Sequence, residues 1–189
     1  SKANKYTFVW KGTVQKNREK LLEKTAVALK QLKEKIKYLS GNEYDENEES
    51  VLEKSCDIDS TIRSYEQQLQ SIPEEKLSKR ERSKLGTRMK HLYDNSNKMR
   101  EYESSLEILG SRNSYSKTDK GATFMRLKED AMNNGQTKPA YNLQIATENQ
   151  YITNFDLYSN PTDTLTFKPF MQKFKWRHGR LPQTVTADS

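Results

Sequence analysis

Heptad-spaced apolar residues in the N-terminal part of the chain, up to Gly110, constrain the fold more than any other feature of the sequence. The first such stretch, from Val14 to Leu39, has two interleaved sets of positions, in which each set recurs every seven residues. These positions are Leu22, Leu29 and Ile36, followed by Thr25, Leu32 and Leu39. The pattern is typical of an α-helix that buries one stripe against a partner helix.

Two further stretches repeat this spacing with different residues. The stripe of the second stretch is Ile58, Ile62, Tyr65, Leu69 and Ile72. The stripe of the third stretch is Leu85, Leu92, Met99, Tyr102, Leu106 and Leu109. Pro73 ends the second stretch, since proline breaks a helix, and Gly110 ends the third. Three helices with one apolar stripe each predict a coiled-coil hairpin or a three-helix bundle.

Beyond Gly110 the pattern changes to shorter segments. Residues 122–132 fit either a short helix or an irregular segment. Apolar and polar side chains then alternate over 140–147 and over 150–158, which is typical of half-buried β-strands. Glu148-Asn149 lies between the two runs, so we expect a hairpin that turns at this pair.

A helix and a third strand are expected after the hairpin. The segment Asn160-Pro-Thr-Asp163 carries helix-start residues, and Gly179 and Pro182 follow the helix. Pro169 must kink this helix or lie in its first turn. The run Thr184–Asp188 would form a strand parallel to one hairpin strand after a right-handed crossover. These segments together predict an α/β protein, α+β by content, with a mixed sheet.

Composition excludes several kinds of site. Cys56 is the only cysteine, so the chain holds neither an internal disulfide nor a cysteine-based zinc site. His91 and His178 lie in charged helical contexts and are interpreted as surface residues. The acidic segment Glu43–Glu49 lacks the glycine and the ligand spacing of a calcium loop. The chain has no apolar run of the ~20 residues that a membrane helix needs, so we expect no membrane partner and a cytoplasmic location.

The net charge of +7 favours a polyanionic partner, and two basic stretches are the candidate DNA-binding residues. The first stretch is Lys76, Lys79, Arg80, Arg82, Lys84, Arg88 and Lys90. The second stretch is Lys173, Lys175, Arg177 and Arg180, which with Lys168 alternate with Phe170, Phe174 and Trp176. Each stretch could contact phosphates or form a solvated helix face. The aromatic residues could serve as core or as stacking platforms for bases.

Asp188, at the end of the expected third strand, is the candidate catalytic and metal-binding residue. Paired carboxylates can hold Mg²⁺ ions that activate a nucleophile and stabilise the leaving oxygen in phosphoryl transfer. One aspartate alone cannot do this, and the alternative is an aspartate that opens a turn.

Four segments resemble bacterial insertion-sequence transposases of the DDE class: Ala3–Lys11, Ala122–Asp130, Lys138–Thr147 and Leu181–Ser189. The most specific part is Tyr-Asn-Leu-Gln-Ile-Ala at 141–146, followed by Thr-Ala-Asp-Ser at 186–189. This resemblance implies an RNase H-like catalytic domain in which two aspartates and a glutamate bind Mg²⁺. Asp188 matches the second aspartate. The resemblance places the first aspartate before Ser1 and the glutamate after Ser189. Asp119 lies in a Thr-Asp pair that loosely resembles a family motif, and no role is assigned to it.

The resemblance divides the chain into three parts. Residues 1–12 would be a strand of the catalytic domain, 13–112 a helical insertion, and 113–189 part of the RNase H-like domain. We therefore expect an internal fragment of a transposase whose parent cuts and joins DNA. The fragment itself would be inactive and would not bind Mg²⁺. It would lie in the bacterial cytoplasm and associate with the nucleoid when bound to DNA. The alternative is a non-enzymatic module that binds DNA or self-associates through its helices.

Overall fold

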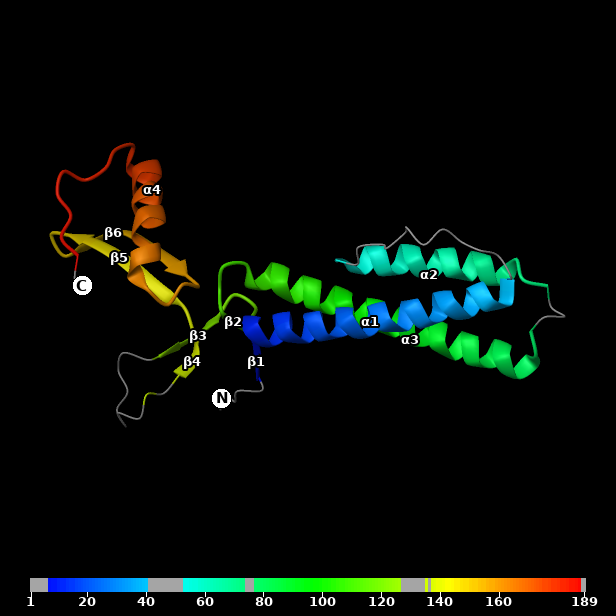
Figure 1. The fold of residues 1–189 in the computed structure, drawn as a ribbon. Helices are drawn as coiled ribbons and strands as arrows, with labels where there is room; N and C mark the ends of the chain where they lie inside the picture. The colour runs from blue at the N-terminus through cyan, green and yellow to red at the C-terminus, as the bar shows by residue number, and fades with distance from the viewer. Residues whose placement is uncertain (1–6, 41–52, 74–76, 127–134, 136, 188–189) are drawn as a thin grey trace. The chain divides into compact units, whose positions relative to one another are not determined.

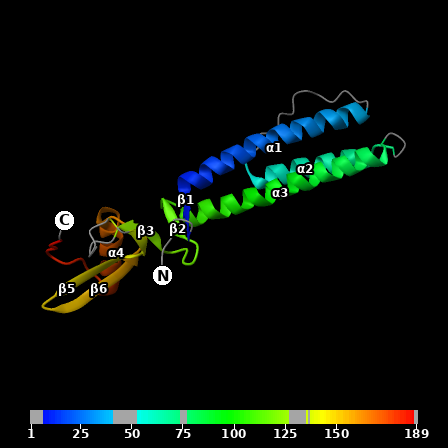
Figure 2. The same cartoon turned by 90° about the horizontal axis from the view of Figure 1, so that it is seen from below.

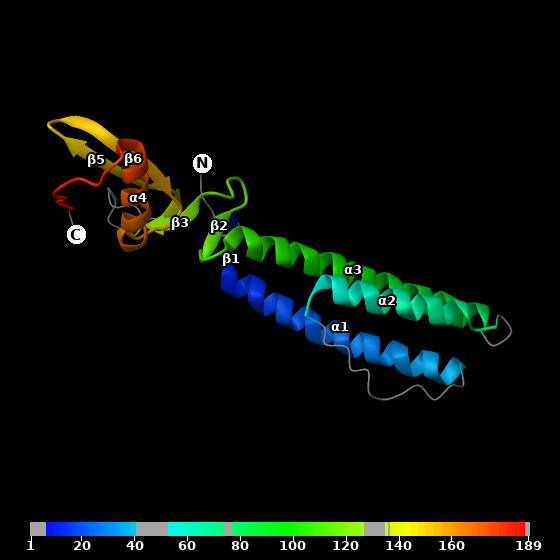
Figure 3. The same ribbon diagram turned by 90° about the horizontal axis from the view of Figure 1, so that it is seen from above.

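The computed structural model describes residues 7–40, 53–73, 77–126, 135 and 137–187, and it divides into two compact units. One unit is Gly12–Glu107, and the other combines Ser1–Lys11 with Ile108–Ser189. The elements of both units can be followed in Figures 1, 2 and 3. The protein is mixed α/β, with long helices in the first unit and small antiparallel sheets in the second.

The helical unit is a three-helix bundle of α1 (Lys11–Ser40), α2 (Ser55–Gln70) and α3 (Lys79–Leu109) (Figure 1). One buried apolar core takes residues from all three helices: Leu29, Leu32, Ile36, Ile58, Ile62, Leu85, Met89, Leu92 and Met99. Most of these residues belong to the expected stripes. Of the two arrangements that the stripes allowed, the three-helix bundle is the one present.

Polar contacts between the helices define their directions. Near the start of α2, Arg18 of α1 donates to the carbonyl oxygen of Glu53. Ser55, at the start of α2, bonds to Glu103, which is late in α3. Glu66, late in α2, accepts from the hydroxyl of Tyr93, which comes earlier in α3. α3 is therefore antiparallel to α2, and the three figures agree that α1 and α2 run parallel.

Side chains cap the first turns of α2 and α3. Ser78 and Glu81 form a reciprocal pair: the Ser78 hydroxyl donates to the Glu81 carboxylate at 2.8 Å and accepts from the Glu81 N–H at 3.3 Å. The hydroxyl and the backbone N–H of Ser78 both donate to the Glu81 carboxylate and lower its pKa. Asp57 accepts from the backbone N–H groups of Lys54 and Glu53, and these bonds lower its pKa in the same way. Both helices therefore begin with an anion at their positive end.

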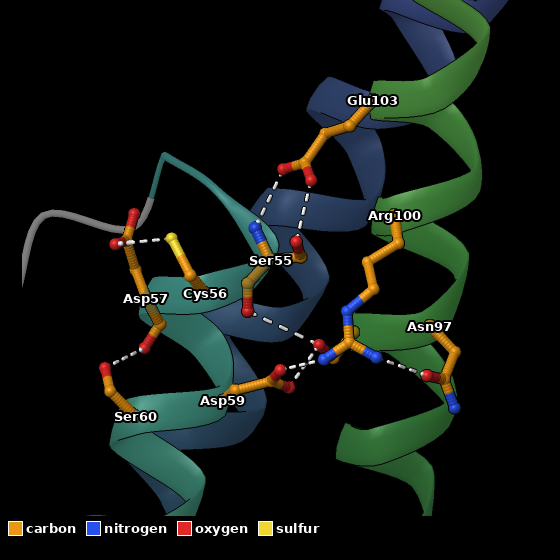
Figure 4. A network of polar contacts seen from close by, with 9 residues as sticks. Ser55, Cys56, Asp57, Asp59, Ser60, Asn97, Arg100 and Glu103 are labelled. Atoms are coloured by element: carbon orange, nitrogen blue, oxygen red, sulfur yellow. Dashed lines mark hydrogen bonds and ion pairs between the residues drawn. The ribbon is translucent and has the colours of Figure 1, made fainter.

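A set of polar residues interrupts the apolar packing between α2 and α3, and we call Ser55, Asp59, Ser96, Arg100 and Glu103 the polar layer (Figure 4). Ser96 is only 1% exposed, and its hydroxyl donates to Asp59. Arg100 donates to the other oxygen of Asp59, while the N–H and the hydroxyl of Ser55 donate to Glu103 at 2.8 and 2.7 Å. Because each group has a partner, the layer avoids the cost of burying unpaired polar atoms.

Gly86 lies inside α3, and a Cβ atom placed on it meets nothing within 4 Å. We expect Gly86→Ala to raise the unfolding free energy of the bundle by about 0.5–1 kcal/mol, because alanine loses less backbone entropy in a helix. Chemical denaturation followed by far-UV circular dichroism measures this. Gly110→Ala is the control: the site is equally open, but its φ of +50° is strained for alanine, so stability should fall. A lower midpoint for Gly86→Ala would contradict the prediction.

The second unit holds three separate two-stranded antiparallel sheets. They pair β1 (Phe8–Trp10) with β2 (Ser114–Ser116), β3 (Thr123–Arg126) with β4 (Thr137–Ala140), and β5 (Asn142–Glu148) with β6 (Tyr151–Tyr158). The expected mixed sheet is therefore wrong for the described residues. Residues 184–187 have no regular structure, so no third strand joins the hairpin among the described residues, which do not include Asp188. The 122–132 segment begins with strand β3 instead of a helix.

The first strand packs beside residues distant in the sequence. The Phe8 ring lies edge-on to the Phe124 ring, with 4.6 Å between centroids, and the Trp10 ring lies 5.0 Å from the same phenylalanine. Tyr115, opposite Val9 in the β1–β2 pair, is buried. Strand β1 thus belongs to the same compact unit as the residues that follow the helices.

The β5–β6 hairpin turns at Asn149 and Gln150, which have φ angles of 50° and 72°. Two consecutive positive φ angles define the turn type that matches the twist of a hairpin. The hairpin itself was predicted, but its turn lies one residue later than expected. The apolar side chains gather on one face, and we call Leu143, Ile145, Ile152, Phe155 and Leu157 the apolar face; all five are exposed.

α4 (Phe167–His178) packs against the opposite, polar face of this hairpin and follows the short 3-10 helix η3 (Asp163–Leu165). Pro169 lies in the first turn of α4, where proline is tolerated, and Gly179 ends the helix with a φ of 73°. The expectation that the alternating strands bury their apolar side is therefore wrong in the described structure: the helix covers the polar side. None of the helices in the described part of the chain has an apolar stretch long enough to span a bilayer.

Candidate nucleic-acid interface

Two of the candidate DNA-binding cations on α4 are bound to strand β6. The Lys173 ammonium lies 2.5 Å from a carboxylate oxygen of Asp156. Arg177 donates to the side-chain oxygen of Asn154 and, at 3.0 Å, to the carbonyl oxygen of Phe155. These contacts join α4 to the polar face of the hairpin. Lys173 and Arg177 therefore hold the helix in place, and a phosphate at either residue would compete with these partners on β6.

The ionisation of Asp156 reflects this packing. Burial alone would raise the pKa of Asp156, but the bonds from Lys173, Tyr158 and the Leu157 N–H together hold it below the usual range. Burial, followed by the neighbouring carboxylate, raises the pKa of Tyr158. The Lys173–Asp156 pair thus favours the α4–hairpin packing at neutral pH. This contribution is lost as the pH falls through the lowered pKa of Asp156.

The aromatic residues of α4 divide between two sides of the helix. Phe170 is 6% exposed and packs inward, and the partly buried Phe174 ring lies 4.3 Å from the ring of His178. Trp176 comes two residues after Phe174, which places it on the opposite side of the helix, and it is 84% exposed. Of the two roles that the sequence allowed, Phe170 belongs to the core, and Trp176 does not.

The outward side of α4 carries the remaining cations. Lys168, Gln172, Lys175 and Trp176 are spaced so that they share this side, and all four are exposed. Arg180, just beyond the helix, is exposed as well. We call Lys168, Gln172, Lys175, Trp176 and Arg180 the outward face of α4. The sequence signal for it was the position of Trp176 off the stripe that Phe170 and Phe174 define.

The first basic stretch lies at the start of α3, apart from Lys76, which is outside the described residues. Its described members are all exposed: Lys79, Arg80, Arg82, Lys84, Arg88 and Lys90. Their helical positions spread around the whole solvent side of α3, on both flanks of the buried Leu85 and Met89. The nearest acidic residue, Glu81, is engaged by Ser78. This stretch is a diffuse basic surface, whereas the outward face of α4 is a narrow one.

Asp188 lies outside the described residues, so its surroundings are not part of the structure. Within the described part of the chain, no group of three or more His, Cys, Asp or Glu residues could hold a metal ion. The carboxylates of this unit bind other side chains instead. Asp156 pairs with Lys173, and Asp163 accepts from the amides of Asn142 and Gln144 at 2.7 and 2.8 Å.

Asp119 organises the turn before β3. Its carboxylate accepts from the Tyr141 hydroxyl at 2.8 and 2.9 Å and from the Gly121 N–H at 3.0 Å, and these bonds lower its pKa. Arg112 donates to the carbonyl oxygens of Gly121 and Lys120 from the other side. A Cβ atom on Gly121 would lie 2.4 Å from the Tyr141 hydroxyl, so a larger residue there would displace the Tyr141 side chain from its bond to Asp119. Asp119 thus has a structural role that the sequence did not indicate.

The two histidines are exposed, as expected. His91 lies on α3, and the His178 ring nitrogen Nε2 lies 3.0 Å from the carbonyl oxygen of Thr153. No family model, curated protein or solved structure matches this chain. A function must therefore be inferred from the sequence segments and from the geometry of α4 and the hairpin.

Proposed function

We propose that the chain is an internal segment of a DDE-class DNA transposase whose parent cuts and joins DNA by Mg²⁺-dependent phosphoryl transfer. The observation that carries this proposal is the order of elements between 142 and 178. An antiparallel hairpin, β5–β6, is followed directly by a helix, α4, packed on one of its faces. A hairpin followed by a helix is the order that the resemblance implies ahead of the second aspartate, and β5 lies almost entirely within one of the segments that carry the resemblance.

The apolar face of the hairpin supports a parent larger than this unit. Complete burial of a Leu, Ile or Phe side chain is worth about 1.5–3 kcal/mol, and five such side chains on this face are exposed. A sheet with one face under α4 and an apolar second face fits a domain that is covered on both sides. In the proposal, further elements of the parent polypeptide cover Leu143, Ile145, Phe155 and their neighbours.

The catalytic part of the proposal concerns Asp188. In the parent, Asp188 would be one of three carboxylates around Mg²⁺, which supplies activation of the nucleophile and stabilisation of the leaving oxygen when bound. This chain contains at most one of the three. Its own residues would contribute positioning: Lys173 and Arg177 fix α4 on the hairpin, and the segment from Gly179 leads from that helix to Asp188.

The test begins with the coding DNA on either side of this segment. We expect an upstream strand with an aspartate and a downstream glutamate in the same reading frame. The longer polypeptide should then join DNA ends with Mg²⁺, and Asp188→Asn should abolish the reaction, because the metal loses a charged ligand. Asp119→Asn is the matched control and should leave activity largely intact, since Asp119 serves the turn near Tyr141.

The 189-residue chain alone should show no Mg²⁺-dependent DNA cleavage. If this chain cleaves DNA and Asp188→Ala abolishes the cleavage, the proposal that the other two metal-binding carboxylates lie outside this chain is wrong. A reading frame that encodes neither flanking carboxylate would overturn the transposase assignment itself.

The exposed cations of α3 favour a second candidate, a non-enzymatic module that binds DNA or self-associates. Phosphate contacts make log affinity fall linearly with log salt, with a slope of roughly −0.9 per neutralised phosphate. Titration of duplex DNA at several salt concentrations tests the binding, and sedimentation tests the self-association. A salt-independent affinity and a monomeric chain would together exclude this candidate.

A further inference from the structure

We propose that the outward face of α4 binds unpaired DNA, with Trp176 as the platform on which a base stacks and Lys168, Lys175 and Arg180 as phosphate contacts. This inference rests on the proposed function, since it takes DNA as the partner. It adds the form of DNA, single-stranded or locally unpaired, and the residue that recognises the base.

The exposure of Trp176 is the first argument. Its ring is 84% exposed although tryptophan is on average well buried, and α4 already fills its inward side with Phe170. Trp176 therefore contributes little to the packing of this unit. An indole ring offers a flat, polarisable surface, and stacking of a nucleic-acid base on such a ring is favourable for every base.

Charge is the second argument. Between Asp163 and Asp188 the sequence has five Lys or Arg residues and no Asp or Glu. Lys173 and Arg177 are engaged with β6. Within the described part of the chain, the other three have no hydrogen bond or ion pair: Lys168, Lys175 and Arg180. A surface with cations, an aromatic ring and no carboxylate complements a polyanion that carries stacking bases.

Stabilisation of α4 by its helix dipole does not account for the position of Lys168. Lys175 and Arg177 lie in the last turn of α4, where positive charge interacts favourably with the helix dipole. Lys168 lies in the first turn, where the same dipole disfavours a cation. Helix stability therefore explains neither Lys168 nor the exposed Trp176, whereas a phosphate-tracking surface explains both.

The geometry of the face suits a strand better than a single phosphate. Lys168 and Trp176 are eight residues apart in α4, which corresponds to about 12 Å along the helix axis. A backbone that lies along this face can contact cations at both ends of α4 while one base meets the indole. Bases within a duplex are covered by their neighbours above and below, so only an unstacked base can offer its face to Trp176.

The experiment uses the full chain in a Trp10→Phe background, so that Trp176 is the only tryptophan. We expect oligo(dT) to quench the tryptophan fluorescence and a blunt duplex of equal length to quench it far less. With a labelled oligo(dT) and anisotropy as the readout, Trp176→Ala should weaken binding about 5- to 150-fold, because one stacked base is lost. Trp176→Phe should retain most of the affinity.

The cations should act differently from the indole. The Lys168→Ala, Lys175→Ala double variant should lower the salt slope by about 1.4, since each phosphate contact on a single strand contributes about 0.7. Trp176→Ala should leave the slope unchanged. Gln172→Ala is the matched control on the same helix face, and it should bind like the unaltered chain. Far-UV circular dichroism should be the same for all these variants, because every changed side chain is exposed.

Three results would overturn the inference: no quenching by oligo(dT), equal quenching by the duplex, or unchanged oligo(dT) affinity for Trp176→Ala. If duplex DNA still binds in a salt-dependent manner in any of these cases, DNA as the partner stands and only the role of Trp176 fails. If neither form of DNA binds, the inference and the DNA-binding part of the proposed function fail together.

Discussion

Phe170→Ala should lower the unfolding free energy of the sheet-containing unit by about 3–5 kcal/mol. Phe155→Ala should change it by about 1 kcal/mol or less, the contribution of the Arg177 guanidinium that lies 5.5 Å from the centroid of the Phe155 ring. The two residues are the same in type, but Phe170 is 6% exposed on the inward side of α4 and Phe155 is 58% exposed on the apolar face of the hairpin. Removal of the first ring leaves a cavity between helix and sheet. Removal of the second ring takes apolar surface away from water.

Tryptophan fluorescence during urea unfolding measures this difference, because the two tryptophans of the chain, Trp10 and Trp176, both belong to this unit. If Phe170→Ala no longer folds, the milder Phe170→Leu should still show a lower midpoint than Phe155→Leu. A cost for Phe155→Ala equal to that for Phe170→Ala would show that the apolar face is covered in solution. The exposed state of that face, and its use in the proposed function, would then be wrong.

Leu32→Ala should lower the unfolding free energy of the helical bundle by about 2–5 kcal/mol. Leu32 has 0% exposure and lies in the core that all three helices share, so alanine would leave a cavity that the surrounding helices cannot fill. Val27→Ala on the same helix is the control. Val27 is 58% exposed, so its loss should cost nothing measurable, and the better helix propensity of alanine should raise stability slightly.

Far-UV circular dichroism follows the bundle, since α1, α2 and α3 contribute most of the helix in the chain. A decrease of less than about 1 kcal/mol for Leu32→Ala would mean that α1 does not pack against α2 and α3 in solution. Equal effects of Leu32→Ala and Val27→Ala would lead to the same conclusion, because the inward and outward sides of α1 would then be equivalent.

The bundle core could be predicted because burial follows the heptad spacing. Leu29, Leu32 and Ile36 were expected on one stripe of α1, and all three are buried. The direction of the helices could not be predicted, since a stripe has the same spacing in either direction. That α1 and α2 run parallel depends on contacts such as Arg18 with Glu53, which join residues distant in the sequence.

The hairpin shows a different limit. Alternation over β5 and β6 predicted the strands and nearly the position of the turn, because period-two patterns and turn residues are local signals. The face of the hairpin that a helix covers depends on residues of both elements, so a local sequence pattern does not predict it. Asn154 and Asp156 face α4 because Lys173 and Arg177 supply partners for them, and four residues on two elements decide that arrangement together.

The candidate interface was predictable in composition but not in detail. The cations of α4 were identified from the sequence, yet their division into bound and exposed groups required the contacts with β6. The exposure of Trp176 follows from its position two residues after Phe174, a signal present in the sequence. The surroundings of Asp188 lie outside the described residues, so its role as the second aspartate stays a prediction.

The polar layer of the bundle has a consequence for alternative states of the helices. Leu85, Leu92 and Met99 repeat every seven residues, so α2 could slide along α3 by one heptad and still meet apolar side chains. Ser96 does not repeat in this way. A one-heptad slide would place the Asp59 carboxylate against Met89 instead of the Ser96 hydroxyl, and the unpaired charge would disfavour that state. The apolar stripes alone would allow more than one alignment of α2 on α3, and the polar layer makes a single alignment favourable.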